Sequence, residues 1–236
     1  EMTRCEEQAE TIEIGGAATY SDCKALLTQF WPHLGELIER LGSLQVRNQG
    51  TIGGNVGNAS PIGDMPPVLI VLNAQLLLRR GDQQRTLPIE DFFKGYRKTD
   101  LQAGEFIEQI IVPKPEPLQS LRAYKISKRH EDDISAVCAA IKLKIEQGVV
   151  AEVDIAFGGM AEIPKRARNC EQALLGKSWT RETIAAGMLA LAEDFSPISD
   201  FRASASYRMQ TAQNLLLRRF LEDEMPISSV RLGHGV

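Results

Sequence analysis

One stretch constrains the fold of this chain more than any other, namely Arg47 to Asp64, which reads RNQGTIGGNVGNASPIGD. It holds five glycines together with Asn, Thr, Ser and Asp side chains, and almost no bulky residue. Glycine lets the backbone turn sharply and approach a ligand closely, and successive N–H groups in such a loop can bind an anion. The same composition is typical of an ordinary surface loop. The order of the residues therefore has to decide between a ligand site and a loop.

The glycine spacing excludes two common nucleotide-binding motifs. Gly53, Gly54 and Gly57 do not form G-x-G-x-x-G, and no strand precedes them in a β–α–β unit. The Gly-Lys-Ser run at 176–178 resembles the end of a Walker A motif, but Glu171 stands where that motif requires glycine. We therefore expect neither a Rossmann site nor a P-loop.

Patterns for hydrolytic or metal-dependent catalysis are also missing from the sequence. There is no G-x-S-x-G motif, the histidines are scattered, and the cysteines form no C-x-x-C pair. This spacing argues against a zinc site or an iron–sulfur cluster built within the chain. A site that uses an organic cofactor needs no such residues, because the cofactor carries the chemistry. The residues concerned are His33, His130, His234, Cys5, Cys23, Cys138 and Cys170.

Composition limits the class of protein. Of 236 residues, 43% are hydrophobic and 25% charged, which is typical of a soluble globular protein. The net charge of −4 gives no reason to expect a nucleic-acid partner. No apolar run approaches the ~20 residues that a membrane helix needs, and no signal peptide is visible. With its cysteines dispersed, the chain is expected in a reducing cytoplasm.

Hydrophobic periodicity predicts an α+β chain of two subdomains. The first, residues 1–117, is expected to be a mixed sheet with helices, and a Pro-rich linker at 114–117 ends it. The second, 118–225, is expected to be a small antiparallel sheet packed on a helical layer, with a loose tail at 226–236. Strands are predicted at 10–14, 74–80, 84–89, 106–112, 136–145 and 149–157, and helices at 21–30, 32–41, 180–193 and 204–222.

Several local details accompany these elements. Ser21 is the expected N-cap of the first helix, and residues 92–96 read as an aromatic loop. Gly81-Asp82 and Gln147-Gly148 are the expected tips of two β-hairpins. Between 141 and 145, apolar residues alternate with Lys142 and Lys144, which predicts one buried face and one wet face.

The residue order resembles the flavin domain of the xanthine dehydrogenase family of molybdenum hydroxylases. The resemblance covers roughly residues 10 to 222, nearly the whole chain. The pieces SPIGD and RHEDDI favour the xanthine dehydrogenase branch over the carbon monoxide dehydrogenase branch. Five blocks carry the resemblance in order: RNQGTIGGN with ASPIGD, then FFKGYRKT from Phe92, IIVP from Ile110, KISKRHEDDI from Lys125 and FGGMA from Phe157.

The resemblance implies a function for the chain. It would bind FAD and pass electrons from [2Fe–2S] clusters through FAD to NAD during purine hydroxylation. Its partners would be a molybdenum-pterin large subunit and an iron–sulfur domain. A related hydroxylase for aldehydes or N-heterocycles, and a docking module that has lost FAD, remain alternatives. A free-standing flavin oxidoreductase of the same fold lacks the matching blocks we would expect.

The resemblance also implies which residues contact FAD. Thr51, Asn55 and Asp64 fall on positions that touch its ribitol and phosphate side, and Gly54 would let the backbone come close. Lys125 falls on a cofactor-contacting lysine. A cap role for Asn55, a turn cap for Asp64 and a surface position for Lys125 are the alternatives.

Two apolar positions complete the expected FAD contacts. Ile107 matches a position beside the ring system, and plain strand core is an equal alternative. Leu41 stands where familiar members of the family carry Phe against the isoalloxazine. Leucine keeps the apolar contact and loses aromatic stacking, worth ~1 kcal/mol, and the alternative is that Leu41 is a core residue.

A charged run at 128–133 would lie beside the flavin and control access of NAD and oxygen. A charge near the ring changes both the flavin potential and the binding of a charged nicotinamide. Arg129 and Asp132 are the candidates in this run, and Tyr96 is expected to face the nicotinamide pocket. A solvated loop and a surface Tyr are the alternatives.

The resemblance also includes an earlier segment with a Gly-rich loop that holds the FAD pyrophosphate. No part of this sequence matches that loop, and the chain starts with Glu1. We therefore expect the chain to be the C-terminal part of a longer protein. We expect the fragment alone to be inactive.

Overall fold

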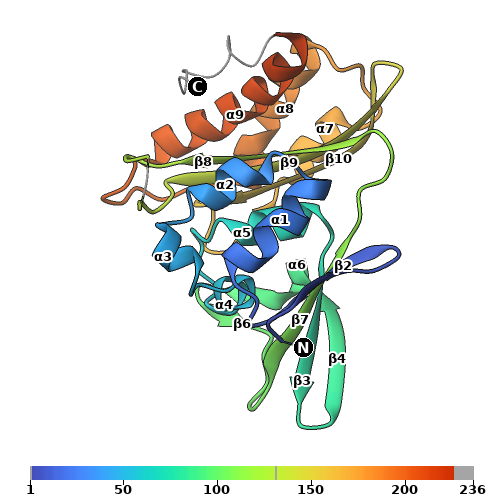
Figure 1. The fold of residues 1–236 in the computed structure, drawn as a ribbon. Coiled ribbons are helices and arrows are strands. Elements are labelled where there is room, and N and C mark those ends of the chain that lie inside the picture. The colour runs from blue at the N-terminus through green and yellow to red at the C-terminus, as the bar shows by residue number, and fades with distance from the viewer. Residues whose placement is uncertain (1, 131, 226–236) are drawn as a thin grey trace.

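The chain forms two antiparallel sheets, whose strands are paired largely as hairpins, and helices connect the two sheets. The computed structural model describes residues 2–130 and 132–225, and in this part a five-stranded and a four-stranded sheet are connected through helices (Figure 1). Both sheets are antiparallel throughout. The structure therefore has the expected α+β class. The sheet expected to be mixed in residues 1–117 is antiparallel, because periodicity within a strand does not show the direction of its neighbours.

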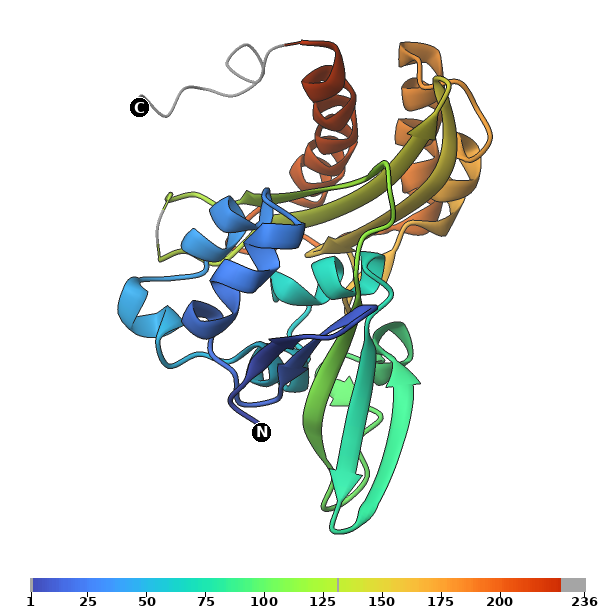
Figure 2. The same cartoon turned by 45° about the vertical axis from the view of Figure 1, so that its right-hand side comes forward.

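The five-stranded sheet is built around a long hairpin and a central strand. The polar tip of this hairpin lies at Gly81, whose φ of +58° suits glycine. This hairpin projects away from the rest of the chain (Figure 2). The expected hairpin is confirmed. In spatial order the strands are β1 (Cys5–Glu7), β2 (Thr11–Gly15), β7 (Phe106–Pro113), β3 (Gln75–Arg80) and β4 (Gln83–Pro88).

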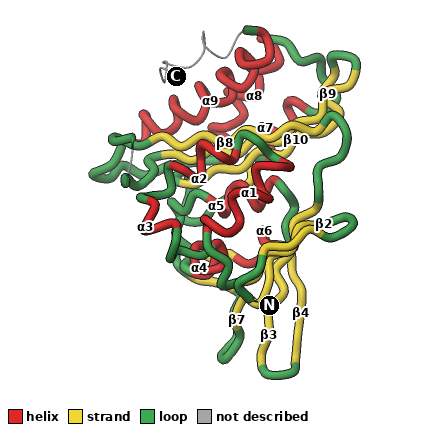
Figure 3. The backbone as a smooth tube through the Cα atoms, in the orientation of Figure 1, coloured by secondary structure: helices red, strands yellow, loops and turns green. Residues whose placement is uncertain are grey.

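The four-stranded sheet lies between two helical layers. One face is covered by α7 (Arg168–Leu174), α8 (Arg181–Asp194) and α9 (Ala205–Glu224), and on the other face lie α1 (Tyr20–Phe30), α2 (Leu34–Glu39) and α5 (Met65–Val71) (Figures 1 and 3). The second expected hairpin, around Gln147-Gly148, is confirmed between β9 and β10. In spatial order the strands are β11 (Lys165–Arg166), β10 (Val149–Gly158), β9 (Val137–Glu146) and β8 (Gln119–Ile126).

The predicted wet face of this sheet is wrong at Lys142. Its side chain is buried and pairs with Asp154 at 2.7 Å between Nζ and Oδ2. β9 is buried from Val137 to Leu143 because helices cover both of its faces. The alternation of Lys and apolar residues did identify the two faces of the strand, but a second helical layer covers the face that was expected to be wet.

The C-terminal helices follow their sequence signals. The two predicted helices are confirmed, and the hydroxyls of Thr180 and Ser204 accept the capping hydrogen bonds at their starts. The tail expected at 226–236 lies outside the described residues. The helices of this layer are α7 (Arg168–Leu174), α8 (Arg181–Asp194) and α9 (Ala205–Glu224).

The N-terminal helices differ from the prediction in several places. The first begins one residue earlier and is capped by Thr19, not Ser21, because Thr19 and Asp22 form a reciprocal capping box. The stretch expected as a glycine loop contains one short helix, begins where another ends at Arg47, and is followed by a third that starts directly after Asp64. These helices are α1 (Tyr20–Phe30), α2 (Leu34–Glu39), α3 (Leu44–Arg47), α4 (Ile52–Gly57) and α5 (Met65–Val71).

The expected aromatic loop is also more regular than predicted. Residues 92–96 end a short helix, α6 (Ile89–Phe92), and enter a two-stranded ribbon of β5 (Phe93–Gly95) and β6 (Lys98–Thr99). The rings of Phe92 and Phe93 pack edge to face at 5.4 Å and are buried. Aromatic burial, which the local pattern does not reveal, orders this segment.

Two hydrophobic clusters stabilise the molecule. One joins the five-stranded sheet, the N-terminal helices and the near face of the four-stranded sheet, and the other lies under α7, α8 and α9. Cys138, Ala140 and Ala156 of the four-stranded sheet belong to the first cluster. The division at 117 into two subdomains stays a prediction.

Candidate functional site

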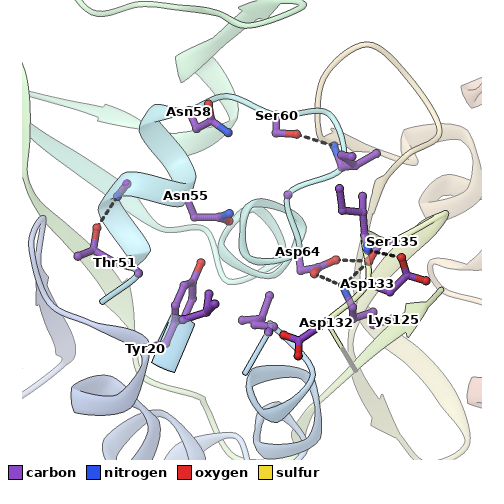
Figure 4. Close-up of a pocket in the computed structure, with 18 residues that line it drawn as sticks. Tyr20, Thr51, Asn55, Asn58, Ser60, Asp64, Lys125, Asp132, Asp133 and Ser135 are labelled. Carbon is purple, nitrogen blue, oxygen red and sulfur yellow. Dashed lines mark hydrogen bonds and ion pairs between the residues drawn. The ribbon is translucent and has the colours of Figure 1, made fainter. Parts of the chain in front are cut away.

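A cavity of about 610 Å³ opens between α1, the glycine-rich stretch and the loop after β8 (Figure 4). Tyr20 lines it from α1, and residues between Leu41 and Asp64 form a second wall. Lys125 and residues 132–135 form the third. Segments more than 60 residues apart in the sequence thus meet at one concave surface.

A buried ion pair forms one wall of the cavity. Lys125 Nζ lies 2.6 Å from Asp64 Oδ2 and donates to Ser135 Oγ at 3.0 Å, while the Ser135 hydroxyl donates to Asp64 Oδ1 (Figure 4). All three residues are buried. A buried pair is tolerated when further hydrogen bonds satisfy both charges, as they do here. The wall therefore presents a fixed carboxylate and a fixed ammonium.

Glycine allows the second wall to approach the backbone directly after β2. A Cβ on Gly53 would lie 2.2 Å from the carbonyl oxygen of Gly16, so no side chain fits there. Thr51 caps α4, and its Oγ accepts a hydrogen bond from the Gly54 N–H at 2.9 Å. Gly54 itself is exposed. The start of α4 is thereby held open toward a ligand.

A second hollow of about 310 Å³ lies on the other side of α4. Ile107 of β7 lines it together with Gly16 and Phe106, and it does not line the first cavity. Thr51 and Gly54 line both hollows. The two hollows therefore meet at the start of α4, and an elongated ligand could occupy both.

Two buried polar atoms beside the first cavity have no hydrogen-bond partner among the residues that the structure describes. They are the Tyr20 hydroxyl and Asn55 Oδ1. Burial raises the pKa of Tyr20, and the neighbouring Asp64 and Cys23 raise it further, so this phenol stays protonated. Buried polar groups are normally paired, so these two atoms fit a polar ligand in the cavity.

The residues expected to control acceptor access lie in different places. Asp132 lines the cavity with a left-handed φ of +48°, whereas Arg129 is exposed and does not line it. The Arg129 N–H donates to Asp133, which lowers the pKa of that carboxyl below its ordinary value. Tyr96 is exposed at the β5–β6 turn, where Arg97 stacks on its ring, and it does not line the cavity.

Leu41 is half-buried at the edge of the first cavity and packs against the N-terminal core. Its position is compatible with both the apolar contact and the core alternative. Sequence reasoning missed Tyr20 and Ser135. Tyr20 follows the helix-capping Thr19 and reads as helix core, and Ser135 gives no local signal, because its partners are distant in sequence.

Residues that could bind a metal are not clustered in the described part of the chain. Among these residues, no group of three or more His, Cys, Asp or Glu side chains could hold an ion. The four cysteines are free thiols, three of them buried. In the same part of the chain, no helix combines the length and apolar character needed to cross a bilayer.

Family models match both halves of the chain. Residues 1–115 match the FAD binding domain in molybdopterin dehydrogenase, and residues 122–223 match the CO dehydrogenase flavoprotein C-terminal domain. The glyceraldehyde dehydrogenase medium chain of Sulfolobus acidocaldarius is 31% identical over 213 residues, covering 89% of this chain and 75% of that protein. The chain belongs to the FAD-binding flavoprotein family of the molybdenum hydroxylases. FAD as cofactor and the expected family are therefore confirmed.

Larger relatives contain the chain as a small part. Nicotinate hydroxylase of Emericella nidulans is 35% identical over 233 residues, which is 90% of this chain and 17% of that protein. Xanthine dehydrogenase of the same organism is 40% identical over 206 residues, 78% of this chain and 15% of that protein. The chain thus spans about a sixth of these relatives.

Solved structures of molybdenum hydroxylases share the fold. Carbon monoxide dehydrogenase of Hydrogenophaga pseudoflava superposes with a TM-score of 0.87 at 29% identity, over 92% of this chain and 76% of that chain. Quinoline 2-oxidoreductase of Pseudomonas putida gives a TM-score of 0.84 at 26% identity, over 94% and 77% of the two chains. The similarity to these solved structures therefore also confirms the expected α+β fold class.

Proposed function

We propose that this chain is the electron-transfer flavin part of a molybdenum hydroxylase. FAD bound to it would accept electrons from [2Fe–2S] clusters and deliver them to an acceptor, a reaction whose chemistry belongs to the cofactor. The observation that carries the proposal is the pair of hollows meeting at Thr51 and Gly54, with unpaired polar atoms at Tyr20 and Asn55. The iron–sulfur domain and a molybdenum-pterin large subunit would be its partners.

The two hollows suggest how the chain holds FAD. The place where the two hollows meet, at Thr51 and Gly54, would face the diphosphate, because the glycine backbone can approach the ligand closely there. Asp64 and Lys125 would offer one acceptor and one donor of fixed position to the wider cavity. Leu41 would give that cavity an apolar edge, and Ile107 would line the second hollow.

The pieces SPIGD and RHEDDI support a xanthine dehydrogenase-like parent that hydroxylates purines and reduces NAD. The 40% identity to a xanthine dehydrogenase supports the same proposal. Relatives named for nicotinate, glyceraldehyde and quinoline support the alternative of an aldehyde or N-heterocycle hydroxylase equally directly. The flavin part does not choose between them, because substrate would be bound on the molybdenum subunit.

We propose that the loop containing Arg129 and Asp132 tunes the reaction with NAD or oxygen. Its position at the cavity supports this role for Asp132. Tyr96 could take part only from a surface outside the cavity, since it points to solvent at the β5–β6 turn. A cytoplasmic location is proposed with this function, because NAD-linked electron transfer and free thiols suit a reducing compartment.

The flavin content of the protein, purified together with its natural partner subunits, tests the proposal. We expect a visible absorption band near ~450 nm, a property of the flavin chromophore, and roughly one FAD for each copy of this chain. The chain alone, with FAD added and excess removed, shows whether the residues present here suffice to hold it. A complete assembly that carries no flavin would contradict electron transfer and favour a docking module.

A further inference from the structure

The first residue of α1 places a phenol beside the flavin cavity, and the surrounding backbone fixes its position. Tyr20 is only 5% exposed, and its N–H donates to the Gly50 carbonyl at 3.1 Å. A Cβ on Gly50 would lie 3.6 Å from the Tyr20 ring, so the ring packs directly on the glycine-rich stretch. A β-bridge between Thr19 and Thr51 ties the same two segments together. The ring therefore moves with the cavity wall.

The hydroxyl of this ring points toward the part of the cavity that Asn55 lines (Figure 4). Its oxygen is buried and has no hydrogen-bond partner among the described residues. Because burial and nearby charges keep it protonated, the group is a hydrogen-bond donor that lacks an acceptor. Packing alone would be served by phenylalanine, which has the same ring and no group to satisfy.

Asn55 provides the complementary half of the site. Its Oδ1 is also buried, has no partner within the described part of the chain, and lies close to Gly63, where an added Cβ would be 3.3 Å away. This atom is an acceptor and needs a donor. The diphosphate of FAD, a diester, carries no proton at neutral pH and so cannot donate to this oxygen. A hydroxyl group can accept from Tyr20 and donate to Asn55 at the same time.

We propose that Tyr20 is a positioning residue for FAD, whose hydroxyl donates a hydrogen bond to the ribityl chain while Asn55 Oδ1 accepts one from it. The ribityl chain presents a row of hydroxyls next to the diphosphate, whereas the other sugar hydroxyls of FAD belong to the ribose of its adenosine half. The inference rests on the proposed flavin function and adds a residue outside the contacts that the sequence implies. Tyr20 would hold the polyol between the wall of Asp64 and Lys125 and the start of α4.

The variant Tyr20→Phe tests this inference, because it removes one oxygen and keeps the ring. In the protein assembled with its natural partners and stripped of FAD, we expect the dissociation constant for FAD to rise about 5- to 30-fold, as for one lost hydrogen bond to a buried group. The melting temperature of the FAD-free form should stay the same or rise, since an unpaired buried hydroxyl is removed. The stabilisation that FAD provides should shrink correspondingly.

Tyr124→Phe is the matched control. Tyr124 is equally buried, but its hydroxyl donates to Glu222 Oε2 at 2.9 Å, under α9 and outside the cavity lining. This variant should lower the melting temperature with and without FAD, and leave the dissociation constant for FAD within about twofold. Opposite signatures in the two variants separate ligand contact from fold stability.

Binding of ADP, which shares the adenosine diphosphate half of FAD and lacks the ribityl chain, locates the contact. Tyr20→Phe should bind ADP as the unaltered protein does. Equal loss of ADP and FAD affinity would overturn the ribityl contact, and unchanged FAD affinity would overturn the role of Tyr20 altogether. An unaltered assembly that binds no FAD would instead overturn the flavin function itself, so the two failures are distinguishable.

Discussion

Asp64 and Lys125 are charged residues that the fold buries side by side, 61 positions apart in the sequence. Burying either charge alone costs several kcal/mol, and the partner with its hydrogen bonds offsets much of that cost. Ser135 satisfies both members at once. A pair held in this way cannot reorient, so its atoms are available to a ligand at fixed positions.

Replacing Asp64 with Ala is expected to weaken FAD retention by ~1–3 kcal/mol, since one charged hydrogen-bonding group is lost. The measurement is the flavin content and the FAD dissociation constant of the variant in its natural assembly. Asp154→Ala provides the control, because it also breaks a buried lysine pair, with Lys142, at a place outside the cavity lining. Both variants should lose fold stability, and only the Asp64 variant should lose FAD. Unchanged flavin content would remove Asp64 from the site.

For individual residues, the sequence allowed us to predict which residues belong to the site, but not which other residues they contact. Asn55, Asp64 and Lys125 were expected at the site, and the structure places all three around one cavity. Their direct roles toward FAD remain predictions. Tyr20 and Ser135 escaped notice because their relevance depends on contacts across 30 or more residues or on a missing partner. Neither kind of relation leaves a local pattern.

Among elements, the hairpins and long amphipathic helices were predictable because their signals are local. The short helix α4 was not, since three of its six residues are glycine, which is unfavourable in a helix by ~1 kcal/mol each. Packing of Gly53 against Gly16 requires a bare backbone at the crossing and outweighs this preference. The wet face predicted for β9 failed for the same reason, because a tertiary layer covered it.

The connection between β4 and β7 is stabilised by an ion pair that predicts acid sensitivity. Arg85 donates to both carboxylate oxygens of Glu105 at 2.8 Å, and the Gln102 N–H donates to Glu105 Oε2 at 2.7 Å. Arg85, followed by the Gln102 N–H, lowers the pKa of Glu105 from 4.5 to about 2. A lowered pKa means that the folded state binds the proton less readily than the unfolded state. This contribution to stability is present above pH 4.5 and is lost as the pH falls through about 2.

Glu105→Gln should therefore be less stable than the unaltered protein at pH 7 and lose less stability between pH 4.5 and pH 2. Urea unfolding midpoints at pH 7, 4.5, 3 and 2 measure both differences. Glu193→Gln, at an exposed position on α8, should follow the unaltered protein at every pH. Parallel curves for Glu105→Gln and the unaltered protein would contradict a specific role of this ion pair.

For the whole molecule, two hydrophobic clusters meet at the four-stranded sheet, and the cavity opens where the loop after β8 faces the glycine-rich stretch. β9 and β10 contribute to both clusters. Periodicity predicted each sheet, but not that one sheet would serve two cores. The cavity follows from that arrangement, because it brings the loop after β8 toward α1 and α4 (Figure 1).

That arrangement places the exposed carboxylate of Asp132 at the cavity, beside Asp133, and it leads to a prediction about the whole enzyme. Two unit charges about 10 Å apart at an effective dielectric constant of about 20 interact by roughly 1–2 kcal/mol, or about tenfold in a rate or affinity. Asp132→Asn should therefore change NAD reduction or oxygen reactivity by about tenfold. Turnover of the hydroxylated substrate with an artificial acceptor should stay intact, because that pathway does not need the nicotinamide to approach this loop.

Asp82→Asn is the control, because it removes an equal charge at the exposed tip of the β3–β4 hairpin, outside the cavity lining. This variant should change neither activity. A parallel fall of both activities in Asp132→Asn would show that the loop supports the fold, and a shift in NAD or oxygen kinetics alone would show that this carboxylate acts on the acceptor.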